Sequence, residues 1–156
     1  MDKKFVQKVV AIPSDHVSLE GGLAIPHDAR GIVLFAHGSG SSRHSPRNIW
    51  VAQALYRNGL ATLLFDLLSK DEDVFYETRF NIDLLTQRLN AATQWVLKQP
   101  DTKSFAIGYF GASTGAAAAL EAAAELGLKI SAVVSRGGRP DLALASLGRV
   151  LAPTLL

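Results

Sequence analysis

The chain has 156 residues, of which 48% are hydrophobic and 19% are charged, which fits one domain with a sizeable core. This composition excludes intrinsic disorder, and no apolar run reaches the roughly 18 residues of a membrane span. The formal charge of +2 is scattered along the chain, so a nucleic-acid partner is not expected.

Cysteine is absent, which excludes disulfides, thiolate metal sites and a cysteine nucleophile. The N-terminal residues also lack the apolar core of a signal peptide. We therefore expect one soluble, cytoplasmic domain over residues 1–156, with no membrane partner, no metal and no cofactor.

The N-terminal third predicts a hairpin and a buried strand. Residues 5–12 and 17–25 carry β-branched residues in partial alternation, and Pro13-Ser14-Asp15 between them is typical of a turn. Residues 31–36 form a continuous apolar run, the pattern of a strand that is buried on both faces.

The middle of the chain predicts a helix, a second buried strand and an acidic loop. Ser45 and Pro46 suit the N-cap and first position of a helix, which Asn58-Gly59 would end. The strand covers residues 60–66, and the loop covers residues 70–77.

The remaining elements continue this alternation. They are an amphipathic helix (80–98), a buried strand (105–110), an Ala-rich helix (116–126), a buried strand (130–135), a short helix (141–148) and the start of a strand (153–156). The order predicts a three-layer α/β domain, in which helices cover both faces of a mostly parallel sheet.

The residues Gly111-Ala112-Ser113-Thr114-Gly115 form a G-x-S-x-G motif between a predicted strand and a predicted helix. A serine nucleophile needs a tight strand-to-helix turn that projects its Oγ above the sheet. Small residues on either side let the strand and the helix approach, and a helix N-terminus favours developing negative charge. The alternative is a small-residue turn that only packs. We predict that Ser113 is a nucleophile.

A second small-residue loop, His37-Gly38-Ser39-Gly40-Ser41-Ser42, follows the first buried strand. Acyl transfer needs two backbone N–H groups directed at the oxyanion, one from the residue after the nucleophile and one from a Gly-rich loop. We predict that Thr114 and Ser39 provide them. Taken alone, the loop is more typical of a flexible connector, and only its combination with residues 111–115 in this chain order favours the functional interpretation.

Four segments carry a family resemblance: FAHGSGSSRHSPRN, LLFDLL, GYFGASTGAAAALEAAA and VVSRGGRPDLA. In this order they resemble the α/β-hydrolase superfamily, in its dienelactone-hydrolase-like branch. The resemblance implies an eight-stranded, mostly parallel sheet and a Ser–Asp–His triad that acts without cofactor on small esters, thioesters or lactones. Dienelactone hydrolases proper use a cysteine nucleophile. Some members of this branch accompany phosphoribosyltransferase domains, but this chain has no acidic diphosphoribosyl-binding motif.

The family order places the acid and the histidine after the nucleophile, and this chain departs from it. Three acids (Glu121, Glu125 and Asp141) and no histidine follow Ser113, while His16, His27, His37 and His44 all precede it. The chain stops at Leu156, where a further strand begins. We therefore expect the last strands of the fold to be missing, little turnover by this chain alone, and self-association through an exposed edge at residues 130–135.

Four other residues are weaker candidates for the site. His44 could act as a general base, although a loop-packing histidine is the simpler interpretation. Asp141 could be the acid, or it could cap the short helix that follows it. Arg136 and Arg139 could hold an anionic group of the substrate, or they could pair with carboxylates.

Two other function classes remain open. Residues 38–43 begin like a dinucleotide-binding fingerprint, and Asp66 lies where a ribose-binding acid would be. Arg43 nevertheless replaces the third glycine, and the helix starts too late to receive a pyrophosphate. The second class is a non-catalytic, hydrolase-like binding module, which the absence of a later histidine favours.

Overall fold

The computed structural model of the protein describes residues 4–156 and contains a seven-stranded sheet in the order β1-β2-β4-β3-β5-β6-β7. The pairings β1·β2 and β2·β4 are antiparallel, and every pairing from β4 to β7 is parallel. The strands are β1 (Lys8–Ser14), β2 (Val17–Ala24), β3 (Gly31–Ala36), β4 (Ala61–Phe65), β5 (Ala106–Ala112), β6 (Ile130–Arg136) and β7 (Thr154–Leu155). The mostly parallel sheet expected from the sequence is confirmed.

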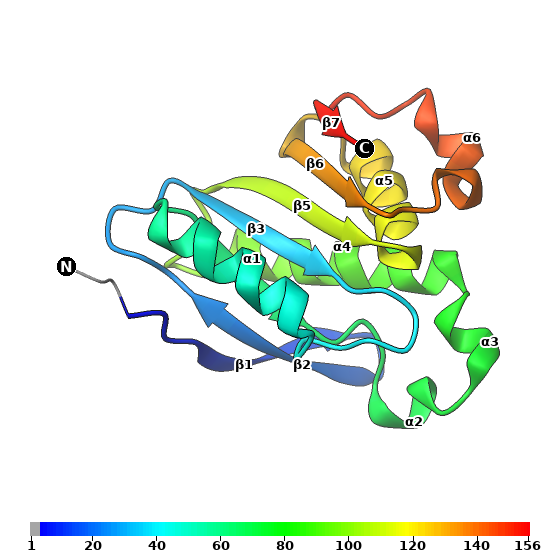
Figure 1. Ribbon diagram of the computed structural model, residues 1–156, viewed down its shortest axis with the longest axis horizontal. Helices are drawn as coiled ribbons and strands as arrows, with labels where there is room; N and C mark the ends of the chain where they lie inside the picture. The colour runs from blue at the N-terminus through cyan, green and yellow to red at the C-terminus, as the bar shows by residue number, and fades with distance from the viewer. Residues whose placement is uncertain (1–3) are drawn as a thin grey trace.

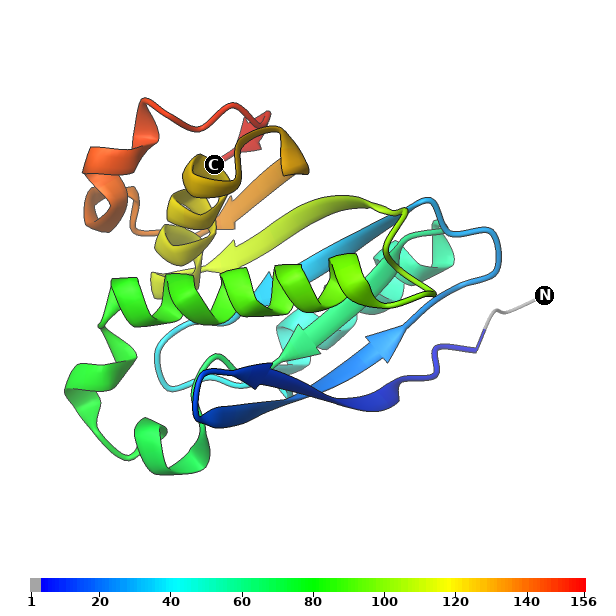
Figure 2. The same cartoon turned by 180° about the vertical axis from the view of Figure 1, so that it is seen from behind.

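Helices cover both faces of this sheet. Figure 1 shows α1 (Pro46–Arg57) on one face, and Figure 2 shows α4 (Ile82–Lys98) and α5 (Thr114–Leu126) on the other. The shorter segments are α2 (Lys70–Asp73), α3 (Tyr76–Arg79), α6 (Leu144–Leu147) and the 3₁₀ turns Gly127–Lys129 and Pro140–Ala143. The three-layer α/β architecture is therefore also confirmed.

The helix ends follow the capping chemistry of the sequence. Ser45 accepts a hydrogen bond from the Asn48 N–H at 3.3 Å and caps α1, and Pro46 occupies the first turn. Gly127 follows α5 with φ of +58°, a conformation that glycine adopts without strain.

Two local predictions were wrong. The antiparallel hairpin is present, but its turn lies at Asp15 and His16 rather than at residues 13–15, because Pro13 and Ser14 still pair with β2; Asp15 takes the turn at φ +48°. The predicted acidic loop instead forms α2 and α3. Ser69 and Glu72 make a capping box at the start of α2, which stabilises even a single helical turn.

A buried arginine holds this short helical segment against α4. The side chain of Arg88 is 2% exposed, and its Nη2 donates to Glu72 Oε1 at 2.5 Å. The Glu72 carboxylate therefore serves both the cap and the ion pair, so α2 and α4 are tied together.

The core lies in two parts because successive residues of each strand face opposite sides of the sheet. Leu34 and Leu63 pack on the α4 and α5 side, whereas Phe35, Leu64 and Phe110 pack under α1. Ala116–Ala119 of α5 are fully buried, and their small side chains allow this helix to approach the sheet closely.

The last strand covers only part of its neighbour. β7 pairs in parallel with Val133 and Val134 of β6, and the Val133 N–H donates to the Pro153 carbonyl at 3.0 Å.

Among residues 4–156, no helix combines the length and the apolar character that crossing a membrane requires.

Candidate active site

Ser113 lies at the sharp turn between β5 and α5, at the edge where the parallel strands end. Its backbone has φ of +52° and ψ of −121°, a region that non-glycine residues rarely adopt. The Ser113 N–H donates to the Arg136 carbonyl of β6 at 3.3 Å, and the Ser113 carbonyl accepts from Ala116 N–H at 3.0 Å. The residue itself is exposed. A strained backbone thus presents this serine at the surface of the sheet edge.

The two glycines of the motif are required by close backbone contacts. A Cβ on Gly111 would lie 2.5 Å from Ala116 Cα, and one on Gly115 would lie 2.1 Å from the Ala36 carbonyl oxygen. Neither distance is compatible with a side chain. The strand–turn–helix geometry therefore explains why small residues occupy both positions.

The loop after β3 lies directly beside Ser113. A Cβ built on Gly38 would be 3.2 Å from Ser113 Cβ. Ser39 and Thr114, which are far apart in the sequence, line the same small cavity of about 10 Å³, which is roughly the space of one water molecule. The structure thus brings together the two residues that the sequence suggested as oxyanion donors.

His37 holds this loop in place. Its Nε2 accepts the Leu67 N–H at 3.0 Å, which leaves Nδ1 to carry the proton and donate to the Gly38 carbonyl at 2.9 Å. Burial lowers the pKa of His37 below its ordinary value. Because backbone groups occupy both ring nitrogens, we assign this histidine a structural role.

The lowered pKa of His37 predicts a loss of stability in acid. The unfolded chain binds a proton near pH 6.5 and the folded chain does so only at lower pH, so the free energy of unfolding should fall as pH drops below about 6.5. Urea unfolding should show a slope of up to about 1.4 kcal/mol per pH unit from this group. His37→Gln should lose this contribution, and the matched variant of the exposed His44, His44→Gln, should keep it. Equal slopes in the wild type and His37→Gln would contradict the assignment.

His44 faces a different cavity from the one that Ser39 and Thr114 line. This cavity, of about 260 Å³, is also lined by Asp66 and Lys70, and Ser113 is not among its lining residues. The Arg43 N–H donates to Asp66 Oδ1 at 2.8 Å, and the Arg43 guanidinium pairs with the same carboxylate. The carboxylate that the dinucleotide interpretation required is therefore engaged by Arg43.

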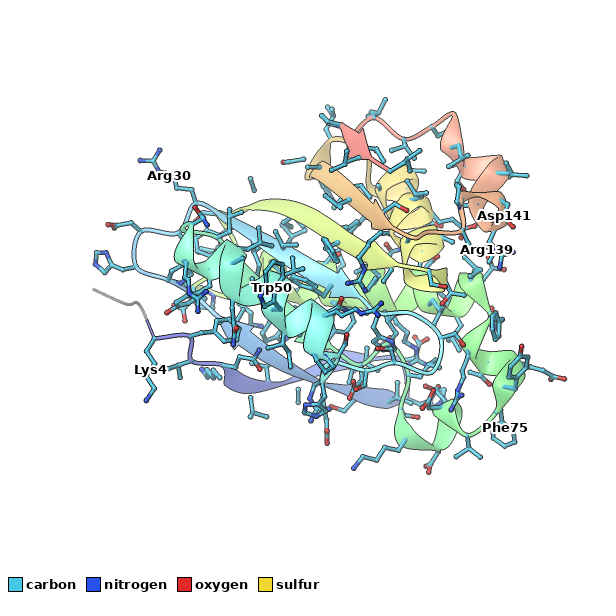
Figure 3. All side chains as sticks on the ribbon, in the orientation of Figure 1. Lys4, Arg30, Trp50, Phe75, Arg139 and Asp141 are labelled. Atoms are coloured by element: carbon cyan, nitrogen blue, oxygen red, sulfur yellow. The ribbon has the colours of Figure 1, made fainter. Side chains whose placement is uncertain are left out.

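Arg139 and Asp141 lie side by side just after the end of β6 (Figure 3). The Arg139 Nε and Nη2 atoms donate to the two Asp141 oxygens at 2.9 and 2.7 Å. These hydrogen bonds lower the pKa of Asp141 and raise that of Arg139. Of the two interpretations of Arg139 raised above, the structure shows the carboxylate pairing. Arg136 instead lies over the Phe110 ring, with its Cζ 5.7 Å from the ring centroid.

Two residues of the site carried no signal in the sequence. Asp73 and Arg79 line the cavity of Ser39 and Thr114, and they form an ion pair with Nε and Oδ1 3.0 Å apart. Asp73 belongs to the segment 70–77 that was predicted as a loop, and Arg79 lies just after it. Within residues 4–156, no hydrogen bond joins the Ser113 hydroxyl to a histidine.

Comparison with solved structures identifies the fold and the family. The chain shares 54% identity and a TM-score of 0.93 with a dienelactone hydrolase from Anabaena variabilis, covering 97% of this chain and 72% of that one. The fold is that of an α/β hydrolase. The chain belongs to the dienelactone hydrolase family within that superfamily. A dienelactone hydrolase-like promiscuous phosphotriesterase from metagenomic libraries has the same fold at 18% identity, a TM-score of 0.78, and coverage of 97% and 67% of the two chains.

Curated sequences add two longer relatives. Two putative phosphoribosyl transferases, from two strains of Mycobacterium tuberculosis, are each 58% identical over 149 residues. This match covers 96% of the chain, which spans only about a third (33%) of the length of each relative. No family model matches the chain.

Proposed function

We propose that this domain is a serine hydrolase that cleaves small esters, thioesters or lactones through an acyl-enzyme on Ser113. The observation that carries the proposal is the positive φ of Ser113 at the junction of β5 and α5, directly beside Gly38. Strain of this kind costs about 1–3 kcal/mol and persists at functional turns. The names of the solved relatives, which include a dienelactone hydrolase and an esterase from Pyrococcus furiosus, support this reaction class.

In the proposed reaction, Ser113 Oγ attacks the carbonyl carbon, and the carbonyl electrons move to the oxygen. The resulting oxyanion would form between the loop after β3, which lies beside Ser113, and the start of α5, where the N–H groups of Ser39 and Thr114 would donate to it. Thr114 is the first residue of α5, so the positive end of the helix dipole favours the same charge. The leaving group departs when the tetrahedral intermediate collapses to the acyl-enzyme.

The Ser113 proton needs a base, and no histidine of residues 4–156 bonds to this hydroxyl. This observation favours the second candidate, a hydrolase-like module that binds without catalysis. The two candidates differ in one respect that can be measured. A catalytic site that lacks only its base should be rescued by added imidazole, whereas a binding module should not.

The test follows acylation of the 156-residue chain by p-nitrophenyl acetate, with and without imidazole. We expect imidazole to accelerate acylation of the protein, measured as the appearance of a single acetyl group by intact mass. If no acetyl group accumulates on the protein at any imidazole concentration, the binding module is the better description.

We assign the transferase named in the longer relatives to sequence outside the 149 shared residues. The shared part has the hydrolase fold and the Ser113 turn. Arg43 also engages Asp66, the carboxylate nearest to a ribose-binding position. A titration with phosphoribosyl diphosphate should accordingly show no binding to this chain.

We propose that the sheet edge lets the 156-residue chain self-associate. β7 pairs with only two residues of β6, so the backbone of Ile130–Ala132 has no strand from β7 beside it. Exposed strand edges of this kind pair with other chains. Sedimentation velocity at increasing concentration should show dimers or larger species, and Ala132→Lys, which adds a charge to the exposed side chain at this edge, should reduce them. A single monomer boundary at all concentrations would contradict the proposal.

A further inference from the structure

An arginine of α3 lies against the loop that would supply the Ser39 N–H. Arg79 lines the same small cavity as Ser39 and Gly40, and its Nη1 lies 3.7 Å from the position of a Cβ on Gly40. Gly40 has φ of +72° and no side chain. No side chain of this residue therefore separates the guanidinium from the backbone of the loop.

Asp73 fixes the orientation of the Arg79 guanidinium. The Arg79 Nε donates to the Asp73 carbonyl and to Asp73 Oδ1, both at 3.0 Å, and Nη2 lies 3.5 Å from Oδ2. Pairing at two nitrogens holds a planar guanidinium in one orientation. Because Nε and Nη2 are directed at Asp73, Nη1 is the nitrogen that lies next to Gly40.

The segment that carries Asp73 is anchored to a buried side chain of α4. The carboxylate of Glu72, the preceding residue, accepts from the Ser69 N–H at 2.9 Å and from Arg88 Nη2 at 2.5 Å. Arg88 is 2% exposed, so this contact fixes α2 to the core. A continuous series of contacts thus runs from α4 through α2 and α3 to Gly40.

The loop is held on both sides of Ser39. The buried ring of His37 bonds to the Gly38 carbonyl through Nδ1 at 2.9 Å. On the other side, Arg79 lies next to Gly40. Ser39 is the residue between these two held positions, so its N–H depends on both of them for its direction.

We infer that Arg79 is a positioning residue, which holds the backbone of Ser39 and Gly40 so that the Ser39 N–H stays directed at an oxyanion formed at Ser113. The inference rests on the proposed function. Arg79 acts through the loop and needs no contact with the oxyanion itself. Stabilisation of an oxyanion depends on donors that are in place before the reaction. A loop without this contact would hold the N–H in other directions for part of the time, which slows the chemical step without weakening ester binding.

The experiment measures the imidazole-dependent acetylation of Ser113 by p-nitrophenyl acetate in Arg79→Met, which keeps the aliphatic stem and removes the guanidinium. We expect the maximal rate to fall about 10-fold, less than the roughly 10²–10³ that loss of a whole donor costs. The half-saturating ester concentration should change less than about twofold. Exposed ion pairs contribute little to stability, so the melting temperature should fall by no more than about 4 °C.

Asp73→Ala tests the same contact without changing the arginine, because it removes the carboxylate that orients Arg79. It should lower the maximal rate as well, and the double variant should be no slower than Arg79→Met alone, since both residues act through Gly40.

Arg149→Met is the matched control. Arg149 is also exposed, bonds to Ser146 Oγ at 3.3 Å and does not line the cavity beside Ser39. The same chemical change at this position should leave the maximal rate within about twofold of the wild type.

Each result points to one claim. An unchanged maximal rate in Arg79→Met, with Ser113 acetylated in the wild type, overturns the positioning role and leaves the proposed nucleophile intact. A change confined to the half-saturating concentration also overturns it, because Arg79 would then act in ester binding. An equal fall in Arg149→Met does the same. If wild-type Ser113 takes up no acetyl group with imidazole present, the proposed function fails and this inference fails with it.

Discussion

Ser113→Ala is expected to reduce the imidazole-dependent acetylation of the chain to zero, with no acetyl group retained on the protein. The variant removes the only atom that forms the covalent bond in the proposed reaction, so the loss should be complete rather than partial. In a related arrangement, removal of the nucleophile costs about as much as removal of the whole triad. The measurement is intact mass after reaction with p-nitrophenyl acetate. The rate of p-nitrophenolate release should then equal the rate that imidazole alone gives in buffer without protein.

Ser39→Ala is the matched control for this prediction. Ser39 is exposed, lies on the neighbouring loop and would contribute only its backbone N–H, which alanine retains. Its acetylation rate should stay within about threefold of the wild type. Equal loss of acetylation in Ser39→Ala and Ser113→Ala would show that the loop serine is a reacting group. Acetylation that survives Ser113→Ala would contradict the assignment of the nucleophile.

Gly115→Ala is expected to prevent folding or to destabilise the protein by at least about 4 kcal/mol. The added Cβ would lie 2.1 Å from the Ala36 carbonyl oxygen and 2.4 Å from that of His37. Both atoms are backbone at the end of β3, so neither can rotate away as a side chain would. Relief requires α5 to separate from the sheet, in a protein whose total stability is of the order of 5–15 kcal/mol. Urea unfolding followed by circular dichroism measures the effect.

Gly148→Ala provides the comparison at a position without such contacts. A Cβ there meets nothing within 4 Å, and the residue has φ of −67° and ψ of −13°. Alanine fits this conformation and reduces the freedom of the unfolded chain, so stability should be unchanged or rise by up to about 1 kcal/mol. Similar stabilities for the two variants would mean that the close contact of α5 with β3 is described wrongly.

The strand–turn–helix unit could be predicted from sequence because its constraints are local. The motif at residues 111–115 has a small residue at each end and lies between a buried strand and an Ala-rich helix. The turn that it forms has the positive φ that a nucleophile elbow adopts. The buried strands were also predicted, because each is a short apolar run between turn residues.

The surroundings of Ser113 could not be predicted, because they depend on contacts between distant segments. The structural role of His37 depends on Leu67, and the burial of Arg88 depends on Glu72. The segment over residues 70–77 was interpreted as a loop from its acidic composition. The S-x-x-E pattern at Ser69 and Glu72 was the signal that could have identified α2.

The interactions of charged side chains could likewise be predicted only between residues that are close in the sequence. Arg139 and Asp141 are two residues apart, so their pairing was an available interpretation, and the structure shows it. Arg79 reaches the cavity beside Gly40 from α3, a helix that the sequence did not predict. Residues that reach a site from an unpredicted element have no signature in the motif itself.

The role of Ser113 as the nucleophile is tested most directly by locating the covalent adduct that a fluorophosphonate leaves on the chain in the presence of imidazole. Proteolysis and tandem mass spectrometry should place a single phosphonyl group on Ser113, and Ser113→Ala should carry none. An adduct on Ser39, Ser41 or Ser42 instead, or a wild-type chain that remains unlabelled while imidazole is present, would contradict the assignment of Ser113 as the nucleophile.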